Sequence, residues 1–284
     1  MSAVSFSVPA EQSRFDNARK LVAFLRRDFL IAWSYRMQFF TDAISLALQA
    51  FMFYFVGRLV DPSKLPSYGG TRATYMEFVG VGIALSAFMQ VGLSHVASAI
   101  RKEQLTGTLE SLLMTPTSTV TMQIGSVVYD LLYVPLRTAG FLAVIALGFG
   151  VHFRAGGILP SAALLLLFIP FVWGLGIASA ASALTFRRGG AGIGFGIVLL
   201  SFGSGAYFPI QLLPHWIAAS AGWNPMAITV NGMRIALLGH LSLSSFAADF
   251  ARLAPLGIIT LVVGLVLFKR ALRREQRRGT LGLY

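Results

Sequence analysis

Glycine-rich and lysine-containing stretches are the first places to look for nucleotide chemistry in this sequence. A run at 189–194, GGAGIG, has the glycine density of a phosphate-binding loop, but it joins two apolar segments and does not follow a strand. Glycines in such a place favour close packing of helices. A P-loop needs Gly-Lys followed by Ser or Thr, and none of the four lysines follows a glycine. The sequence therefore predicts no P-loop in this chain.

The sequence also contains no pattern typical of a catalytic nucleophile or of a metal site. The run FGSG at 202–205 is similar to an intramembrane serine protease site, yet Phe202 replaces the first glycine and Ser204 has no evident base. The four histidines have no metal-ligand spacing, and cysteine is absent. We therefore predict that the chain is not an enzyme and that it binds no metal and no cofactor of its own.

Three charged residues fall inside apolar segments, where a charge is costly and often functional. Arg137 lies near the middle of its segment, two residues after Pro135. Asp130 is on the same helical face, about 10 Å away along the axis, and Asp42 near the start of the first segment is a second candidate partner. We favour a structural ion pair that holds helices together, and contact with a transported substrate is the alternative.

The longest polar stretch in the middle of the chain is RKEQLTGTLESLLMTPT at 101–117. Four leucines between positions 105 and 113 recur at helical spacing and form one stripe. Glu103 and Glu110 lie largely off that stripe, and Pro116 ends the helix because it lacks an N–H and restricts the residue before it. The pattern predicts a short amphipathic helix at 101–116.

This stretch resembles the loop between the second and third spans of ABC transporter type-2 permeases. In that family a basic-acidic cluster precedes Gly-Thr-Leu-Glu, and Thr-Pro follows. The matching residues here are Arg101, Lys102, Glu103, Gly107, Thr108, Leu109, Glu110, Thr115 and Pro116. The resemblance implies that the stretch is a coupling helix resting in a groove of a cytoplasmic ABC ATPase subunit. ATP and magnesium would then be bound by that partner.

The composition is that of an integral membrane protein. Hydrophobic residues make up 56% of the 284 residues and charged residues only 12%, about half the share in soluble domains. Six apolar segments are long enough for spans of about 20 residues; they lie near 39–59, 78–100, 124–149, 159–184, 193–213 and 253–268. We predict an all-α membrane protein with six transmembrane helices. The net charge of +12 suits membrane surfaces, so we expect no nucleic acid partner.

The charges also predict the organisation and orientation of the chain. Residues 1–36 form a tail and an amphipathic helix, 37–269 the transmembrane domain, and 270–284 a basic tail. Sixteen basic residues fall on the side of both termini and six on the other, so both termini are expected in the cytoplasm. The amphipathic helix either only anchors the chain at anionic lipids or also touches the ATPase. Abundant Ala, Gly and Arg suggest a bacterial inner membrane protein.

The segment 207–240 is expected on the outer side, between the last two spans. Pro209, Pro214 and Trp216 make its first part too broken for one straight helix and too apolar for a free loop. Asn224 and Pro225 begin a helix that runs to about 238, with the proline in the first turn. An Asn-Pro followed nine residues later by an arginine, here Arg234, is also similar to the type-2 permeases. That likeness implies short re-entrant helices that close the outer end, and a packed interfacial loop is the alternative.

These observations favour the permease subunit of an ABC exporter that works by alternating access. Six spans imply a partner, either a second copy or a related permease, with two ATPase subunits below. A hydrophobic or amphipathic substrate such as a drug, lipid or lipid-linked glycan is preferred, and a polysaccharide is the alternative. A secondary transporter is less favoured because no internal repeat is visible. Aromatic and sulfur side chains that could line the route or face lipid are Phe51, Phe53, Tyr54, Phe55, Phe88 and Met89.

Overall fold

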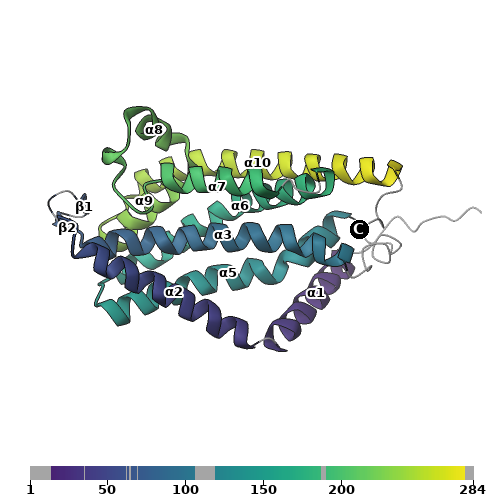
Figure 1. Cartoon of the computed structure of the whole chain (residues 1–284), viewed down its shortest axis with the longest axis horizontal. Helices are drawn as coiled ribbons and strands as arrows, with labels where there is room; N and C mark the ends of the chain where they lie inside the picture. Colours follow the sequence, from purple (N-terminus) through teal and green to yellow (C-terminus); the bar gives the residue numbers. More distant parts are fainter. Residues whose placement is uncertain are drawn as a thin grey trace, which may run out of the picture.

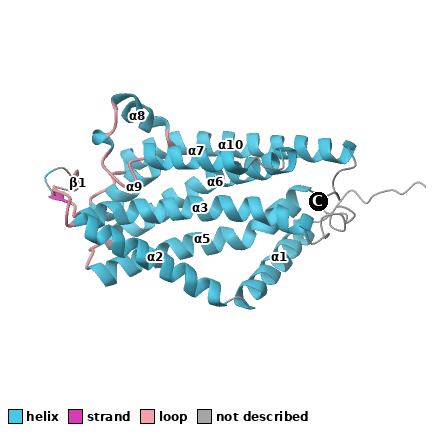
Figure 2. Ribbon diagram, viewed as in Figure 1, coloured by secondary structure: helices cyan, strands magenta, loops and turns pink. Residues whose placement is uncertain are grey.

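Long helices dominate the structure, because a backbone inside a bilayer must satisfy its own hydrogen bonds. The computed structural model describes residues 14–34, 36–61, 63, 65–68, 70–105, 119–186 and 190–278. Figure 2 shows that nearly all of this chain is helical. The longer helices are α1 (Arg14–Ser34), α2 (Arg36–Gly57), α3 (Tyr75–Leu105), α5 (Thr119–Phe149), α6 (Ile158–Phe186), α7 (Gly190–Gly203), α9 (Pro225–Leu238) and α10 (Leu243–Arg278).

The connections at one end of the molecule carry the remaining regular structure. Strands β1 (Ser67–Tyr68) and β2 (Thr71–Arg72) form a small antiparallel pair with Ser67 opposite Arg72. The link from α7 to α9 contains the short helix α8 (His215–Ser220) and 3₁₀ turns at Ile210–Leu212 and Ala221–Trp223, and a third such turn, Ala155–Gly157, precedes α6. Figure 1 shows β1, β2 and α8 at the end opposite the C-terminal ends of α3 and α10.

Five helices of the described chain are long and apolar enough to cross a bilayer. The all-α membrane class is thus supported, while the exact six-span topology stays a prediction. The segment predicted near 193–213 is wrong in its extent, because α7 ends at Gly203. Its 14 residues cover about 21 Å, which is less than the hydrocarbon thickness of about 30 Å.

Helix α7 ends at Gly203 because the chain turns at Gly205, two residues later. Gly205 adopts a φ of 69°, a left-handed conformation that glycine reaches without strain. The hydroxyl of Ser204 donates to the Ser201 carbonyl over 2.6 Å and accepts from the Ala206 N–H over 3.2 Å. The chain therefore turns sharply here, where the apolar pattern alone suggested a continuing helix.

Helix α3 is the centre of the packing. Within Tyr75–Ser94, 72% of the residues are buried, whereas in Phe40–Gly57 of α2 only 6% are. Leu85 and Met89 of α3 pack with Phe168 of α6 and Met233 of α9 in one apolar core. Figure 1 shows α3 between the α2–α5 side and the α6–α10 side. The fold is consequently dense around α3 and open around α2.

Helices α6 and α10 pack through backbone contacts at glycines. A Cβ on Gly174 would meet the backbone of Thr260 and Leu261, and one on Gly264 would meet the carbonyl of Gly174. Close approach of this kind is how small residues join helices in membranes, where burial of apolar surface supplies little drive.

The two ends of the described chain are also helical. The amphipathic helix predicted within residues 1–36 corresponds to α1, which is helical over Arg14–Ser34, and its place at the membrane surface stays a prediction. The last helix is longer than the predicted 253–268, since α10 extends from Leu243 to Arg278 and so continues into the predicted basic tail. Its basic residues beyond 268 thus lie on a continuous helix as far as Arg278.

Candidate functional site

The first functional candidate is helix α9, whose start follows the predicted Asn-Pro pattern. The side-chain oxygen of Asn224 accepts from the Met226 N–H over 3.0 Å, and Pro225 occupies the first turn. The Asn224 amide also donates to the carbonyl of Leu200 in α7 over 2.9 Å. The predicted helix start is confirmed, and the same asparagine ties α9 to α7.

Arg234 of α9 is a buried cation, with only 3% of its surface exposed. Its guanidinium donates to the carbonyl of Phe78 over 2.9 Å, of Gly205 over 3.0 Å and of Ala206 over 2.8 Å. The same group lies 3.6 Å from the centroid of the Phe78 ring and so also makes a cation–π contact. One side chain therefore joins α9, the N-terminal end of α3 and the turn after α7.

Neighbouring contacts close this cluster further. The Tyr75 hydroxyl donates to the Tyr207 carbonyl over 3.2 Å, and the Tyr207 ring stacks on Phe53 of α2 at 5.6 Å. Gly82 lies so close to Ala206 that a Cβ there would overlap its carbonyl. Burial raises the pKa of the Tyr68 phenol, and the nearby Arg234 charge opposes that rise. We call Tyr75, Phe78, Ala206, Tyr207 and Arg234 the outer cluster.

The remaining predicted outer-gate residues lie at the edge of this cluster. Pro209 is buried and precedes the turn Ile210–Leu212, whereas Pro214 and Trp216 are exposed. The structure thus brings Asn224, Pro225 and Arg234 into the packed region and leaves Trp216 on the surface. An exposed tryptophan suits the interface between membrane and water. The gating role of these residues and their re-entrant course stay predictions.

At the other end of the molecule, α3 runs into the predicted coupling stretch. Arg101, Lys102 and Glu103 are in the last turns of α3, which continues without a break to Leu105. The other predicted coupling residues, Gly107, Thr108, Leu109, Glu110 and Pro116, lie outside the described residues. Where the first part of a separate helix was predicted, the structure has the end of α3.

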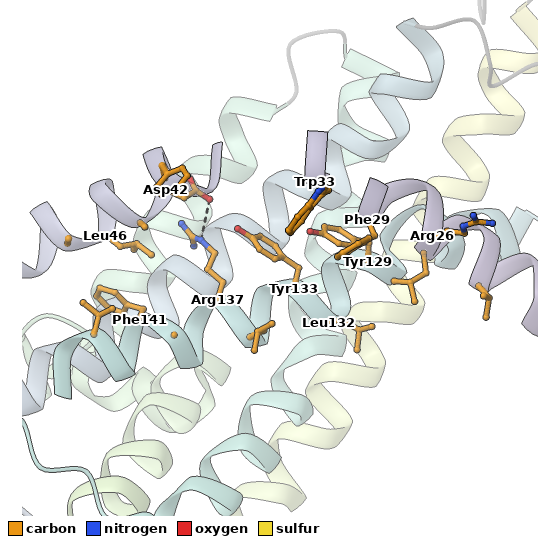
Figure 3. Close-up of a pocket in the computed structure, with 18 residues that line it drawn as sticks. Arg26, Phe29, Trp33, Asp42, Leu46, Tyr129, Leu132, Tyr133, Arg137 and Phe141 are labelled. Carbon is orange, nitrogen blue, oxygen red and sulfur yellow. Dashed lines mark ion pairs between the residues drawn. The ribbon is translucent and has the colours of Figure 1, made fainter. Parts of the chain in front are cut away.

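The predicted ion pair of Arg137 forms with Asp42. Arg137 Nε lies 3.3 Å from Asp42 Oδ2, with 13% and 38% of the two side chains exposed. The pair joins α5 to α2 (Figure 3), although Nε makes no hydrogen bond of good geometry. Asp130 is on α5, and its side chain lies outside the described part of the structure. Of the two partners considered, the structure brings Asp42 to Arg137.

The aromatic residues considered for the substrate route divide into two groups. Phe88 and Met89 are buried in the core against α6, so they face neither lipid nor an open route here. Phe51 and Phe55 are on the exposed face of α2 with 54% and 49% of their surface exposed. Tyr54 packs on Phe149. The exposed face of α2 is therefore the part of this set that is open to a partner, substrate or lipid.

Sequence reasoning missed most partners of Arg234. Phe78, Gly205 and Ala206 take part through backbone carbonyls, which every residue has and which leave no pattern in a sequence. Arg154 was also missed; its N–H donates to the Leu237 carbonyl over 2.8 Å and its guanidinium to the Gly239 carbonyl over 3.3 Å. Within the described residues, no group of three His, Cys, Asp or Glu could hold a metal ion.

Comparison with protein families gives one further finding. Residues 19–238 match the family described as ABC-2 type transporter. The match begins in α1 and ends at the last residue of α9, so it includes Asp42, Arg137 and Arg234. A comparison with curated proteins finds no match. Because the family match covers well over half of the chain, this protein belongs to the ABC-2 type transporter family, whose members are membrane subunits of transporters and generally pair with an ATPase subunit.

Proposed function

We propose that this chain is the permease subunit of an ATP-driven exporter in a bacterial inner membrane, with both termini in the cytoplasm. The observation that carries the proposal is the continuity of α3. This helix extends from Tyr75, a member of the outer cluster, to Leu105, five residues into the stretch 101–117 that resembles a coupling helix. A displacement of that stretch would therefore reach the outer end through one packed helix.

The mechanism follows from what α3 connects. Arg234 holds the carbonyl of Phe78 at the start of α3 and the carbonyls of Gly205 and Ala206 after α7. A push or tilt of α3 from the ATPase side would therefore act on all three Arg234 hydrogen bonds at once. Alternating access would then be a rigid-body change of helices about this cluster, of the kind known for transporter switching.

A second permease, either a copy of this chain or a relative, would complete the route. Helix α2 has 6% of its residues buried in Phe40–Gly57, and α10 has 17% in Leu243–Arg274. Phe51 and Phe55 on α2 belong to this uncovered apolar surface. We propose a hydrophobic or amphipathic substrate, such as a drug, lipid or lipid-linked glycan, because the uncovered surface is apolar and aromatic. A polysaccharide is the competing substrate class.

The test changes charge on the proposed coupling stretch. The variants Glu103→Lys and Glu110→Lys are co-expressed with the ABC ATPase subunit that binds the wild-type chain, and ATPase pull-down and export in vesicles are measured together. A charged contact with the ATPase would be lost and replaced by repulsion, so we expect weaker ATPase binding or hydrolysis uncoupled from export.

The matched control is Arg252→Glu, a charge reversal at an exposed residue of α10 on the predicted outer side. It should leave ATPase binding unchanged. Wild-type binding and export in both glutamate variants would show that this stretch is not the coupling element. Magnesium-dependent ATP hydrolysis by the purified chain alone would contradict the proposal that a separate subunit hydrolyses ATP.

A further inference from the structure

A large cleft lies between α1, α2 and α5, away from the outer cluster. Helices α1 and α2 diverge on either side of residue 35, and α5 runs along their open side (Figure 1). The cavity between them has a volume of about 1080 Å³, which is the size of a pocket for a large organic ligand. Its walls come from three helices, and of these α2 is the least covered, with 6% of Phe40–Gly57 buried.

The surface of the cleft is apolar and aromatic. Phe29 and Trp33 of α1 are exposed by 52% and 56%, and Leu132 and Leu136 of α5 by 58% and 72%, and all four line it. In a bilayer such a surface is covered by lipid or by protein, because water does not enter the hydrocarbon region. Its occupant must therefore be apolar over most of its length.

Polarity changes along the cleft in one direction. Figure 3 shows Arg26 at one end, the aromatic residues Phe29, Trp33, Tyr129 and Tyr133 next, and the Asp42–Arg137 pair beyond them. Leu46 and Phe141 line the far end. The order is thus a cation, then aromatic rings, then the Asp42–Arg137 ion pair, and then aliphatic and aromatic side chains. Apart from that ion pair, it matches the order of headgroup, interface and acyl chain in a lipid.

The charges favour an anionic headgroup. Arg26 is exposed, and within the described chain no ion pair involves it. Helix α1 carries five basic and two acidic residues, so its surroundings are positive. The Asp42 carboxylate also faces the cleft, but Arg137 at 3.3 Å neutralises it. Basic residues beside the cytoplasmic leaflet attract anionic lipids, and in the proposed orientation α1 lies at that leaflet.

We propose that this cleft binds one anionic phospholipid of the inner leaflet. The phosphate lies at Arg26, and an acyl chain lies along Trp33, Leu136 and Phe141 between α1, α2 and α5. The lipid supplies packing that the chain itself does not provide there and holds α1 against α5. The headgroup assignment rests on the proposed orientation, while the chain-binding part of the site does not depend on transport activity.

Tryptophan quenching tests the site directly. A protein whose single tryptophan is Trp33, made by changing Trp173, Trp216 and Trp223 to Phe, is placed in phosphatidylcholine vesicles. A small fraction of the lipid is phosphatidylglycerol or phosphatidylcholine brominated on its acyl chains. We expect the brominated phosphatidylglycerol to quench Trp33 with about fivefold higher apparent affinity, the contribution of one basic residue at a membrane surface. Arg26→Gln should remove this preference.

Two glycines of α5 supply a matched pair of cleft variants. Gly140 lines the cleft and Gly148 does not, and an added Cβ at either position meets no atom within 4 Å. Gly140→Leu should therefore fill the cleft and lower the quenching of Trp33, whereas Gly148→Leu should leave it unchanged. Ala43→Phe, on the α2 wall, gives a second blocked cleft should Gly140→Leu fail to fold.

Three results would overturn the proposal. Equal quenching by both brominated lipids in the single-tryptophan protein with Arg26 intact would show that the site does not select an anionic headgroup. Unchanged quenching in both blocked-cleft variants would show that Trp33 meets only bulk lipid. If neither brominated lipid quenches Trp33, the cleft is covered by protein, such as a second copy of the chain. None of these results depends on ATPase binding, so failure here is distinguishable from failure of the proposed transport function.

Discussion

Arg234 offers the sharpest test of how the outer end is held together. The substitution Arg234→Met keeps a long apolar side chain in place and removes the guanidinium that donates to three carbonyls. Those carbonyls belong to α3 and to the turn after α7, and 3% of the arginine surface is exposed. Water therefore cannot easily replace the lost donor.

The magnitude follows from the number of bonds. Polar contacts between helices in membrane proteins contribute about 0.6 kcal/mol each on average, with a maximum near 1.7 kcal/mol. Three such bonds and one cation–π contact of about 0.5–2 kcal/mol give roughly 2–7 kcal/mol. Removing a buried charge offsets part of this loss, so we expect Arg234→Met to destabilise the protein by about 2–4 kcal/mol.

Arg234→Lys separates geometry from charge. A lysine keeps the positive charge but cannot present the planar fork that reaches three acceptors, so we expect it to recover only part of the lost stability. Arg273→Met, at an exposed arginine of α10, is the control for loss of a charge. Melting temperatures in detergent are measured for all three variants. If Arg234→Met and Arg273→Met have the same melting temperature, Arg234 does not hold these helices together.

Two further predictions concern pairs of residues in contact. Asp42→Leu should destabilise the protein by about 1–3 kcal/mol because Arg137 is left mostly buried without its partner. Adding Arg137→Leu should recover stability, as measured by melting temperatures in a double-mutant cycle, and additive losses would show that the two residues do not interact. Gly82→Ala should destabilise by about 1–3 kcal/mol because its Cβ would overlap the Ala206 carbonyl, whereas Gly140→Ala should be neutral or stabilising, and equal melting of the two would contradict the close contact.

The sequence predicted those features that depend on side-chain pattern. The amphipathic helix expected within residues 1–36 corresponds to α1, and the Asn224–Pro225 pair predicted the start of α9. The rule that a buried charge needs a partner led to Arg137 and two possible carboxylates, although the rule alone did not choose Asp42 over Asp130. These inferences succeeded because each depends on residue types that few other environments tolerate.

Other features could not be predicted because they depend on backbone geometry or on distant contacts. The end of α7 at Gly203 is set by a turn at Gly205 with positive φ, and several glycines in this chain lie within uninterrupted helices. The acceptors of Arg234 are carbonyls from elements far apart in sequence. The cleft beside α1 arises from the divergence of α1 and α2, which no local pattern specifies.

The two sides of the molecule differ in packing, and this difference bears on how a transport cycle can proceed. On one side α6 and α10 touch backbone to backbone at Gly174 and Gly264, and α3 and α9 are joined by Arg234. On the other side, α5 packs along α3, but only 6% of Phe40–Gly57 in α2 is buried. Interfaces with few buried contacts are the ones that open at low cost. Helices α3, α5, α6, α9 and α10 are therefore expected to move as one body, and the rearrangement between inward-facing and outward-facing states is expected where α2 meets that body.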